Sequence, residues 1–327
     1  MSNTSQTKIT LDSLKDLPAR KVRQAFVYLN ARRYGLSGVE AKHCAVEWHK
    51  VMTRCFTQAV AGELYNTSNV RAVNFPKNRN GRELYTTAHF SAYTIVSIVL
   101  AHSYNRPVYI LVGQPPIEWE QTLVSSLADA GVNGTVIKSN FSQLKRIKRA
   151  IEEDAIIISL IDVPWHRDNS VPNREYQSFN LGAGKILASH SIFKIANKLG
   201  LEPTFILCEP TSDGFDVVHH GNLSQQECFE KLAAAVDRAP EHFERFCELQ
   251  QYYEGGNEIK EIVTFQLGEN RYIVDSTRKK YWMLGEKLSA YIDTMTKQGS
   301  SELEITKVIL NQIHKLIGHQ YDEVIYL

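Results

Sequence analysis

The chain has 327 residues, of which 43% are hydrophobic and 22% are charged, a composition that supports one large folded domain or one domain with an appendage. Lysine and arginine total 37 against 36 aspartate and glutamate residues, so we expect no nucleic-acid partner bound through a general basic field. The five cysteines form no CxxC pair, which argues against a disulfide framework or a zinc ribbon and favours a reducing, cytoplasmic location. No apolar stretch reaches the roughly 18 residues of a membrane span, so we expect no integral membrane anchor.

Helical periodicity runs through residues 14–61, and after the polar stretch 75–84 the pattern changes to an alternation of helices and buried strands. We predict helices over 92–104, 116–131, 142–154 and 186–200, and strands over 106–113, 134–139, 155–163 and 203–209. This alternation indicates an α/β fold with a largely parallel central sheet and helices on both faces.

The remaining segments predict a hairpin partner over 214–221 and helices over 224–239 and 241–253. Gly255 and Gly256 then mark a boundary, which predicts two domains at 1–252 and 257–327. The second would be a small α+β module, with a hairpin over 261–276 and two helices, for which a winged-helix-like arrangement is one interpretation. The balanced charge of its last helix favours packing or protein binding over DNA binding.

The stretch TTAHFSAYTIVSIVLA, residues 86–101, places His89 where a strand would meet a helix. A neutral imidazole there can take a proton from an attacking hydroxyl or amine and return it to a leaving group. A purely structural hydrogen-bonding histidine is the alternative interpretation.

Residues 86–114, TTAHFSAYTIVSIVLAHSYNRPVYILVGQ, resemble the first signature region of the lipid A late acyltransferase family, within the lysophospholipid acyltransferase superfamily. In that pattern a histidine is followed, after four residues, by an acidic residue, but this chain has Thr94 at that position. The order of elements is similar over roughly residues 20–250, including a buried strand that ends in Asp162. The family's membrane anchor has no counterpart, Gln114 stands where the family has an arginine, and the C-terminal module lies outside the pattern.

The resemblance implies an acyltransferase-like fold and acyl transfer. His89 would be the general base for an amine or hydroxyl acceptor, either a small molecule or a carrier-bound intermediate, that attacks an acyl or aminoacyl thioester. The thioester would be held on a carrier protein or on coenzyme A, with no bound cofactor. Because Thr94 cannot supply the charge of the missing acid, Asp162, Asp168 and Glu83 are the candidate substitutes, and an amine acceptor is somewhat favoured. Asp162 follows a buried strand, where parallel sheets place ligand sites, although a turn-capping role is an equal alternative.

Other motifs carry weaker predictions. In LGAGK, Gly182, Gly184 and Lys185 precede a predicted helix and suit a docked phosphate, for example that of pantetheine, unless they form only a tight turn. We predict that Gln114 and His166 contact substrate. Asp162, His166 and Asp168 could ligate a metal, but a polar surface loop is the better interpretation, so we expect no metal. The basic stripe at 145–150 reads as a solvated helix face or as a surface for an acidic carrier protein.

Two other functions stay open. One is a non-catalytic binding protein on a decayed acyltransferase scaffold, in which Thr94 marks lost catalysis. The other is a thioester hydrolase that uses the same base with water. A carboxylate within hydrogen-bond reach of the His89 ring, beside an acyl-sized apolar pocket, would favour the transferase.

Overall fold

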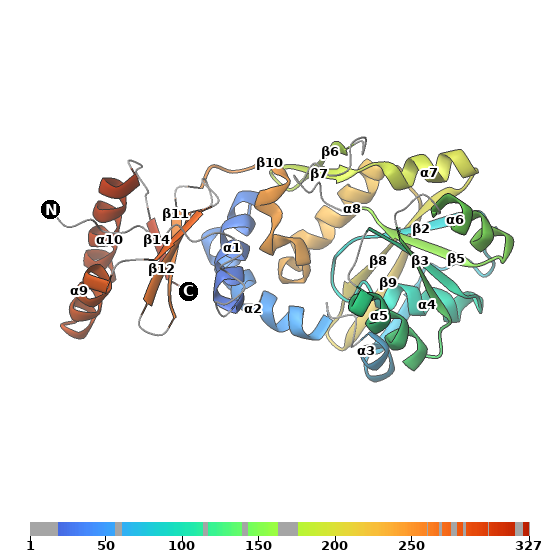
Figure 1. Ribbon diagram of the computed structural model, residues 1–327, viewed down its shortest axis with the longest axis horizontal. Helices are drawn as coiled ribbons and strands as arrows, with labels where there is room; N and C mark the ends of the chain where they lie inside the picture. Colours follow the sequence, from blue (N-terminus) through green and yellow to red (C-terminus); the bar gives the residue numbers. More distant parts are fainter. Residues whose placement is uncertain are drawn as a thin grey trace. The chain divides into compact units, whose positions relative to one another are not determined.

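A computed structural model describes residues 19–55, 61–113, 117–138, 143–162, 176–259, 261–267, 270–275, 280–283, 286–299, 301–317 and 323–326 (Figure 1). Contacts divide the chain into two compact units. The larger unit comprises Lys50–Arg245 and Gln251–Gly255, and the smaller comprises Met1–His49, Phe246–Gln250 and Gly256–Leu327. Within the described ranges, no helix is long and apolar enough to cross a bilayer.

The larger unit is built on a seven-stranded sheet in the order β1-β9-β8-β2-β5-β3-β4. Its strands are β1 (Asn69–Val73), β2 (Glu83–Thr87), β3 (Val108–Val112), β4 (Gly134–Lys138), β5 (Ile156–Leu160), β8 (Glu202–Pro210) and β9 (Gly214–Asn222). The five neighbouring strands β8, β2, β5, β3 and β4 are parallel to one another. Strand β9 pairs antiparallel with β8, and the edge strand β1 pairs parallel with β9. The predicted α/β fold with a largely parallel central sheet is therefore confirmed, as is the hairpin partner of the strand at 202–210.

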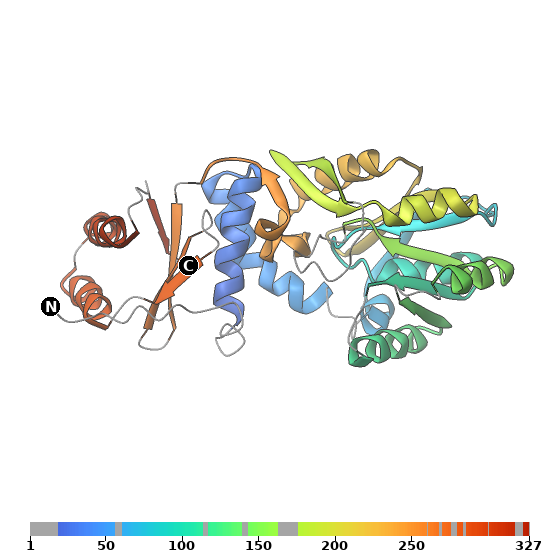
Figure 2. The ribbon, with the colours of Figure 1, turned by 45° about the horizontal axis from the view of Figure 1, so that its top comes forward.

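Helices cover both faces of this sheet because apolar side chains alternate between the faces along each strand. The helices are α3 (Ala61–Thr67), α4 (Ile95–Tyr104), α5 (Ile117–Asp129), α6 (Gln143–Glu152), α7 (Ser191–Leu199) and α8 (Gln225–Arg238). In β2, Leu84 packs with the apolar residues of α6 and α7, and the next residue, Tyr85, packs with those of α3, α4 and α5. Figures 1 and 2 show these two helix groups on opposite sides of the sheet.

Helix α4 is the most buried of these helices, because residues 95–101 are all buried. Each large aliphatic side chain removed from water in this way contributes about 1.5–3 kcal/mol. The helix ends where Asn105 adopts a left-handed conformation, with φ of 51°, and Pro107 follows two residues later. This packing fixes α4, and with it the loop that carries His89, against the sheet.

Two predicted helices are wrong in part. Residues 184–189, four of which we expected in a helix, form strand β7 (Gly184–Ser189), which pairs with β6 (Tyr176–Leu181) and β10 (Tyr253–Gly255); this hairpin is yellow-green in Figure 2. The helix predicted over 241–253 is replaced by three short 3-10 turns, η3 (Pro240–His242), η4 (Glu244–Cys247) and η5 (Leu249–Gln251), followed by β10. Phe243 is extended there because it pairs with Phe90, a long-range contact that overrides the local helical pattern.

The smaller unit contains α1 (Ala19–Tyr34) and the first part of α2 (Gly38–Cys55). Its other elements are β11 (Glu261–Leu267), β12 (Asn270–Asp275), β13 (Lys280–Met283), β14 (Glu323–Tyr326), α9 (Glu286–Lys297) and α10 (Glu302–Ile317). Helix α1 contacts β11 and β12, and Asn257 N–H donates to Arg33 O at 3.0 Å. The first helices therefore share a unit with the C-terminal elements, a division that differs from domains at 1–252 and 257–327. The winged-helix-like interpretation stays a prediction.

Candidate functional site

The candidate site lies at the carboxyl ends of two neighbouring strands. Strands β2 and β5 are parallel and adjacent, and Thr87 pairs with Leu160 at their ends. His89 follows β2 at the same distance as Asp162 follows β5. Because parallel strands in register end at one edge of the sheet, the two side chains meet there, where open α/β sheets place ligand sites.

A carboxylate holds the His89 ring. His89 Nδ1 lies 2.8 Å from Asp162 Oδ1, and the backbone N–H of His89 donates to the two carboxylate oxygens at 3.2 and 3.1 Å. The Asp162 side chain is 0% exposed and that of His89 is 11% exposed. A proton on Nδ1 that is donated to Asp162 leaves the Nε2 lone pair free for a proton from elsewhere, which is the arrangement of a general base with its orienting acid.

Asp162 stays ionised in this buried position. Burial favours the neutral carboxyl, but His89, through the charge of its protonated ring and through its hydrogen bonds, and Arg245, through its charge, outweigh burial and lower the pKa of Asp162 below its ordinary value. A charged Asp162 stabilises the imidazolium that forms when His89 accepts a proton. Asp162 therefore gives His89 the carboxylate partner that Thr94, at the acidic position of the motif, cannot provide.

Arg245, from η4, is a third member of the site that the sequence did not indicate. Its Nη2 atom lies 2.9 Å from both Nδ1 and Nε2 of His89, and its Nε lies 3.8 Å from Asp162 Oδ2. An atom equally distant from both ring nitrogens lies off the line of either lone pair, so this is a charge contact over the ring more than a directed hydrogen bond. Arg245 lies within the helix predicted over 241–253, and no motif distinguishes it from a surface arginine.

The segment 240–245 pairs with the loop after β2, and this pairing places Arg245 next to the His89 ring. Phe243 forms an antiparallel bridge with Phe90, Ser91 N–H donates to His242 O at 2.8 Å, and Glu244 N–H donates to His89 O at 3.1 Å. Ser91 is held at φ of 53°, in the left-handed region that serine rarely adopts. Burial, with the charge of Arg54, lowers the pKa of His242 to about 4. The two hydrogen bonds, which form the bridge, fix the position of the Arg245 main chain relative to His89.

Thr94 lies close to His89 in sequence but does not hold it. Thr94 precedes α4, is 6% exposed, and its hydroxyl has no hydrogen-bond partner within the described part of the chain. It lines a cavity of about 40 Å³ together with Thr87, Tyr93 and mainly apolar side chains of β3, β5 and α5. Tyr93 also packs edge-on against the His89 ring, with centroids 4.9 Å apart. The cavity lies beside the dyad and is too small for more than a few atoms.

Of the other predicted residues, those that the structure describes lie apart from the dyad. Glu83 is at the opposite end of β2, where its Oε1 accepts from Asn80 N–H at 2.7 Å. Gln114, His166 and Asp168 lie outside the described residues. The described ranges contain no cluster of three or more potential metal ligands. That finding does not cover the set of Asp162, His166 and Asp168, because two of the three lie outside these ranges.

The prediction that LGAGK opens a helix is wrong. Gly182, at φ of 56°, forms the turn of the β6–β7 hairpin, and Lys185 is part of β7, so no helix N-terminus lies next to these residues. A side chain at Gly184 would place its Cβ 2.6 Å from Glu254 O, so glycine is needed for the close approach of β10. Strand packing accounts for Gly184, and the docked phosphate stays a prediction.

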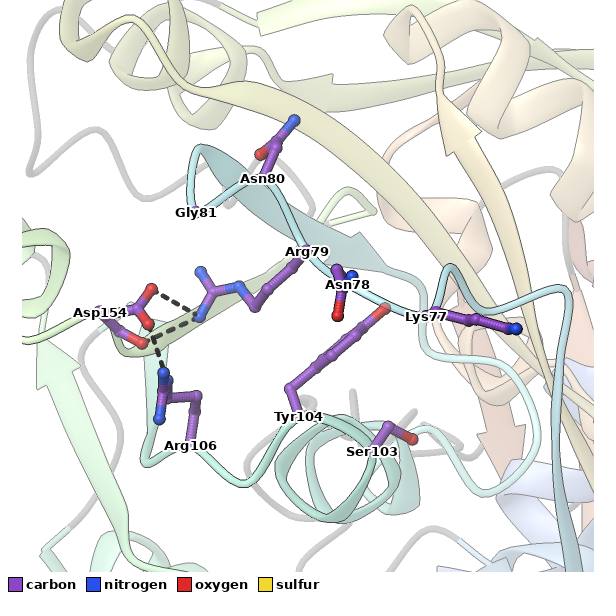
Figure 3. A pocket seen from close by; sticks show the side chains of 9 residues that line it. All are labelled: Lys77, Asn78, Arg79, Asn80, Gly81, Ser103, Tyr104, Arg106 and Asp154. Carbon is purple, nitrogen blue, oxygen red and sulfur yellow. Dashed lines mark hydrogen bonds and ion pairs between the residues drawn. The ribbon is translucent and has the colours of Figure 1, made fainter.

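A larger cavity, of about 400 Å³, lies at the opposite, amino edge of the same strands. Figure 3 shows Arg79 and Arg106 converging on Asp154 at one side of this cavity, with Lys77, Asn78 and Tyr104 on its other walls. Arg79 donates to the backbone oxygens of Asp154 at 2.9 Å and Ala155 at 3.3 Å. These carbonyls belong to the short connection between α6 and β5, so the arginine binds the backbone that leads into β5.

Comparison with known proteins adds no assignment. No protein-family model matches the chain, and no curated protein matches it. The functional conclusion therefore depends on the geometry of the site.

Proposed function

We propose that the larger unit catalyses acyl transfer from a thioester to an amine or hydroxyl, with His89 as general base and Asp162 as its orienting acid. The observation that carries this proposal is the 2.8 Å contact between His89 Nδ1 and the wholly buried Asp162 carboxylate. A buried carboxylate kept charged beside a partly accessible imidazole is costly for stability alone and is typical of catalytic sites.

In the proposed reaction, Nε2 of His89 takes a proton from the acceptor as its oxygen or nitrogen attacks the thioester carbonyl. Asp162 stabilises the imidazolium that forms. The tetrahedral intermediate then collapses, the C–S bond breaks, and the imidazolium returns the proton to the departing thiolate. The products are an ester or amide and a free thiol, and His89 is again neutral.

The geometry changes the expected acceptor. A preference for amines followed from the missing acid at Thr94, because a neutral amine attacks before it loses its proton. With Asp162 bonded to His89, a hydroxyl acceptor is equally well served. The nature of the acceptor is therefore open on chemical grounds, and both classes belong in the first assay.

The donor we propose carries a short acyl or aminoacyl group on coenzyme A or a carrier protein. The cavity of about 40 Å³ beside the dyad favours a small group over a long chain. An acidic carrier protein is supported by the exposed basic side chains of Lys145, Lys148 and Arg149 on α6. Helix α6 follows the carboxyl end of β4, so its first turn lies at the same edge of the sheet as His89.

The test is turnover of acyl and aminoacyl thioesters, on coenzyme A and on a carrier protein, with mixed amines and alcohols, followed by mass spectrometry. We expect His89→Ala to lower product formation by about 10²–10⁴-fold. His43→Ala, which changes an exposed histidine of α2, is the matched control and should retain wild-type turnover. Full turnover by His89→Ala would falsify the mechanism, and release of free acid without acceptor product would identify a thioester hydrolase.

A non-catalytic binding protein is the second candidate, and one observation favours it. Arg245 lies against both ring nitrogens, and the adjacent cavity is small, so the dyad as it stands presents little open space. If the wild-type protein binds acyl-carrier or acyl-coenzyme A thioesters without converting any of them, this candidate replaces the transferase.

A further inference from the structure

The cavity of about 400 Å³ at the amino edge of the sheet has the volume of a small-molecule site. We call it the amino-edge cavity. Among the described residues that line it, none has an aliphatic side chain, and its walls carry three cations, one carboxylate and uncharged polar groups (Figure 3). Such walls suit a polar ligand and not a hydrocarbon chain.

The amino-edge cavity is separate from the site of His89 and Asp162. Glu83, at the start of β2, pairs with the wall residue Arg79, whereas His89 follows the other end of the same strand. The five residues of β2 alone span roughly 17 Å, at about 3.3 Å each. A ligand in this cavity would not reach His89, so this inference is independent of the proposed function.

Arg79 is a structural part of the wall. Its Nη1 donates to Asp154 O at 2.9 Å, and its Nη2 donates to Ala155 O at 3.3 Å. Its Nε lies 3.5 Å from Glu83 Oε2, and the side chain is only 9% exposed. Because these partners surround the guanidinium, Arg79 has little hydrogen-bonding capacity left for a ligand.

Arg106 is held from one side only. Its Nε donates to Asp154 Oδ2 at 2.7 Å, and its Nη1 donates to Asn105 O at 3.5 Å, which is long for a hydrogen bond. Its Nη2 has no partner within the described part of the chain, and the side chain is 46% exposed. The outer N–H groups of Arg106 can therefore bind two oxygens of one oxyanion.

The charges around the cavity are not balanced. Lys77, Arg79 and Arg106 carry three positive charges, against two negative charges on Asp154 and on Glu83, which pairs with Arg79. The Lys77 ammonium has no hydrogen bond or ion pair with any residue in the described ranges. What the cavity has to spare is positive charge and N–H donors, and these favour an anionic ligand.

The aromatic residue of the wall does not favour a nucleotide. The Tyr104 ring already stacks with Phe75 and with Tyr85, with centroids 6.1 and 6.4 Å apart. Its packing with these two rings makes it a poor platform for a nucleobase. The groups that remain for a ligand are then hydrogen-bonding groups rather than a stacking surface.

We propose that the amino-edge cavity binds a phosphorylated sugar or a similar phosphate ester of a polyol, with Arg106 as the anchor of the phosphate. Figure 3 shows Lys77, Asn78 and Ser103 on the walls away from Asp154. All three are exposed, and their side chains suit the hydroxyl groups of such a ligand. The volume beyond the phosphate is thereby used by the polyol.

The first test is calorimetric titration of the full chain with glucose-6-phosphate, inorganic phosphate, ATP and glucose. We expect glucose-6-phosphate to bind with one site per chain and at least about tenfold more tightly than inorganic phosphate, because its hydroxyls add hydrogen bonds. Glucose should not bind at the same concentrations. Equal affinity for inorganic phosphate would overturn the polyol and leave the free ion as ligand, and tighter binding of ATP would overturn the argument against nucleotides. Absence of binding by every phosphate compound at millimolar concentration would overturn the site.

A pair of arginine variants tests the position of the phosphate. Arg106→Gln should weaken glucose-6-phosphate binding by about tenfold or more, because it removes charge-assisted hydrogen bonds. Arg82→Gln is the matched control: Arg82 is exposed and does not line the cavity, so its loss should change the affinity by no more than about twofold. If Arg106→Gln fails to fold, Lys77→Gln takes its place, with an expected loss of about threefold.

Asp154→Asn should have the opposite effect. It removes the carboxylate that repels a phosphate and that competes for Arg106, so binding should tighten several-fold. Asparagine also suits the left-handed backbone of this residue, at φ of 50°, so the variant should fold. Damage to the structure alone would weaken binding. Weaker binding by Asp154→Asn, or unchanged binding by Arg106→Gln, would overturn the assignment of the phosphate to Arg106.

Discussion

The two edges of the central sheet carry similar charges and put them to different uses. At the carboxyl edge, Asp162 faces His89 and Arg245 and is 0% exposed. At the amino edge, Asp154 lies between Arg79 and Arg106, at 3.4 and 2.7 Å, and is 50% exposed. The larger cavity is at the amino edge, about 400 Å³ against about 40 Å³ (Figure 3). The larger cavity and the side chains suited to catalysis therefore lie at opposite ends of the same strands.

The difference follows from what each edge must satisfy. At the amino edge, Arg79 donates to the carbonyls of Asp154 and Ala155, in the connection between α6 and β5, so its charge serves the backbone there. At the carboxyl edge, Asp162 also accepts from the backbone, at the N–H of His89, but it binds the imidazole as well. An ion pair is informative about function only after the backbone groups around it have been accounted for.

Exchange of the two aspartates for asparagine gives the largest expected contrast. Asp162→Asn removes the charge that stabilises the imidazolium and the acceptor that sets the tautomer, and we expect about a 10⁴-fold loss of acyl transfer. Asp154→Asn should leave the transfer rate unchanged, because that carboxylate is exposed and remote from the dyad. Circular dichroism of both variants checks folding, and equal losses in the two would refute the distinction between the edges.

His242 should make the stability of the folded protein depend on pH. The pKa of His242 is lowered to about 4, below its ordinary 6.5. Between these two pH values the His242 ring is neutral in the folded protein but protonated in the unfolded chain. Stability is therefore lost as the pH falls from about 6.5 to 4, by up to about 3 kcal/mol. Denaturant unfolding of the wild type and His242→Gln should give a gap between them that changes by this amount across the window. A constant gap would mean that His242 is not buried as described.

Thr94 should give the smallest effect, despite its place in the sequence motif. Its buried hydroxyl has no hydrogen-bond partner among the described residues, so Thr94→Val should change the free energy of unfolding by about 1 kcal/mol or less, in the stabilising direction, and keep acyl transfer. Thr86→Val is the matched control, because the Thr86 hydroxyl donates to Thr204 O at 3.4 Å and its loss should destabilise. A large loss of transfer in Thr94→Val would return Thr94 to the catalytic site.

Much of the dyad could be predicted from the sequence. His89 and Asp162 each follow a buried apolar run, and such runs end where parallel sheets bind ligands. The choice among Asp162, Asp168 and Glu83 required strand order: β5 is the neighbour of β2, and Glu83 begins the strand whose other end leads to His89. Burial periodicity cannot supply this order, because it says which residues are inside but not which strands are adjacent.

The errors have a shared cause. LGAGK fits a hairpin turn as well as a helix start, and residues 241–253 have a helical pattern that pairing with Phe90 and the β7 edge interrupts. Local sequence signals were consistent with both outcomes in each case. Contacts with distant segments selected between them.

By itself the sequence determined the alternation of helices and strands, the two-faced sheet and the positions of His89 and Asp162 at strand ends, because these depend on local periodicity. The tertiary structure decided that Asp162 holds His89 across 73 residues of chain and that Arg245 covers the ring across 156. Both contacts depend on strand pairing and on the bridge between Phe90 and Phe243. These pairings set distances that no local pattern encodes.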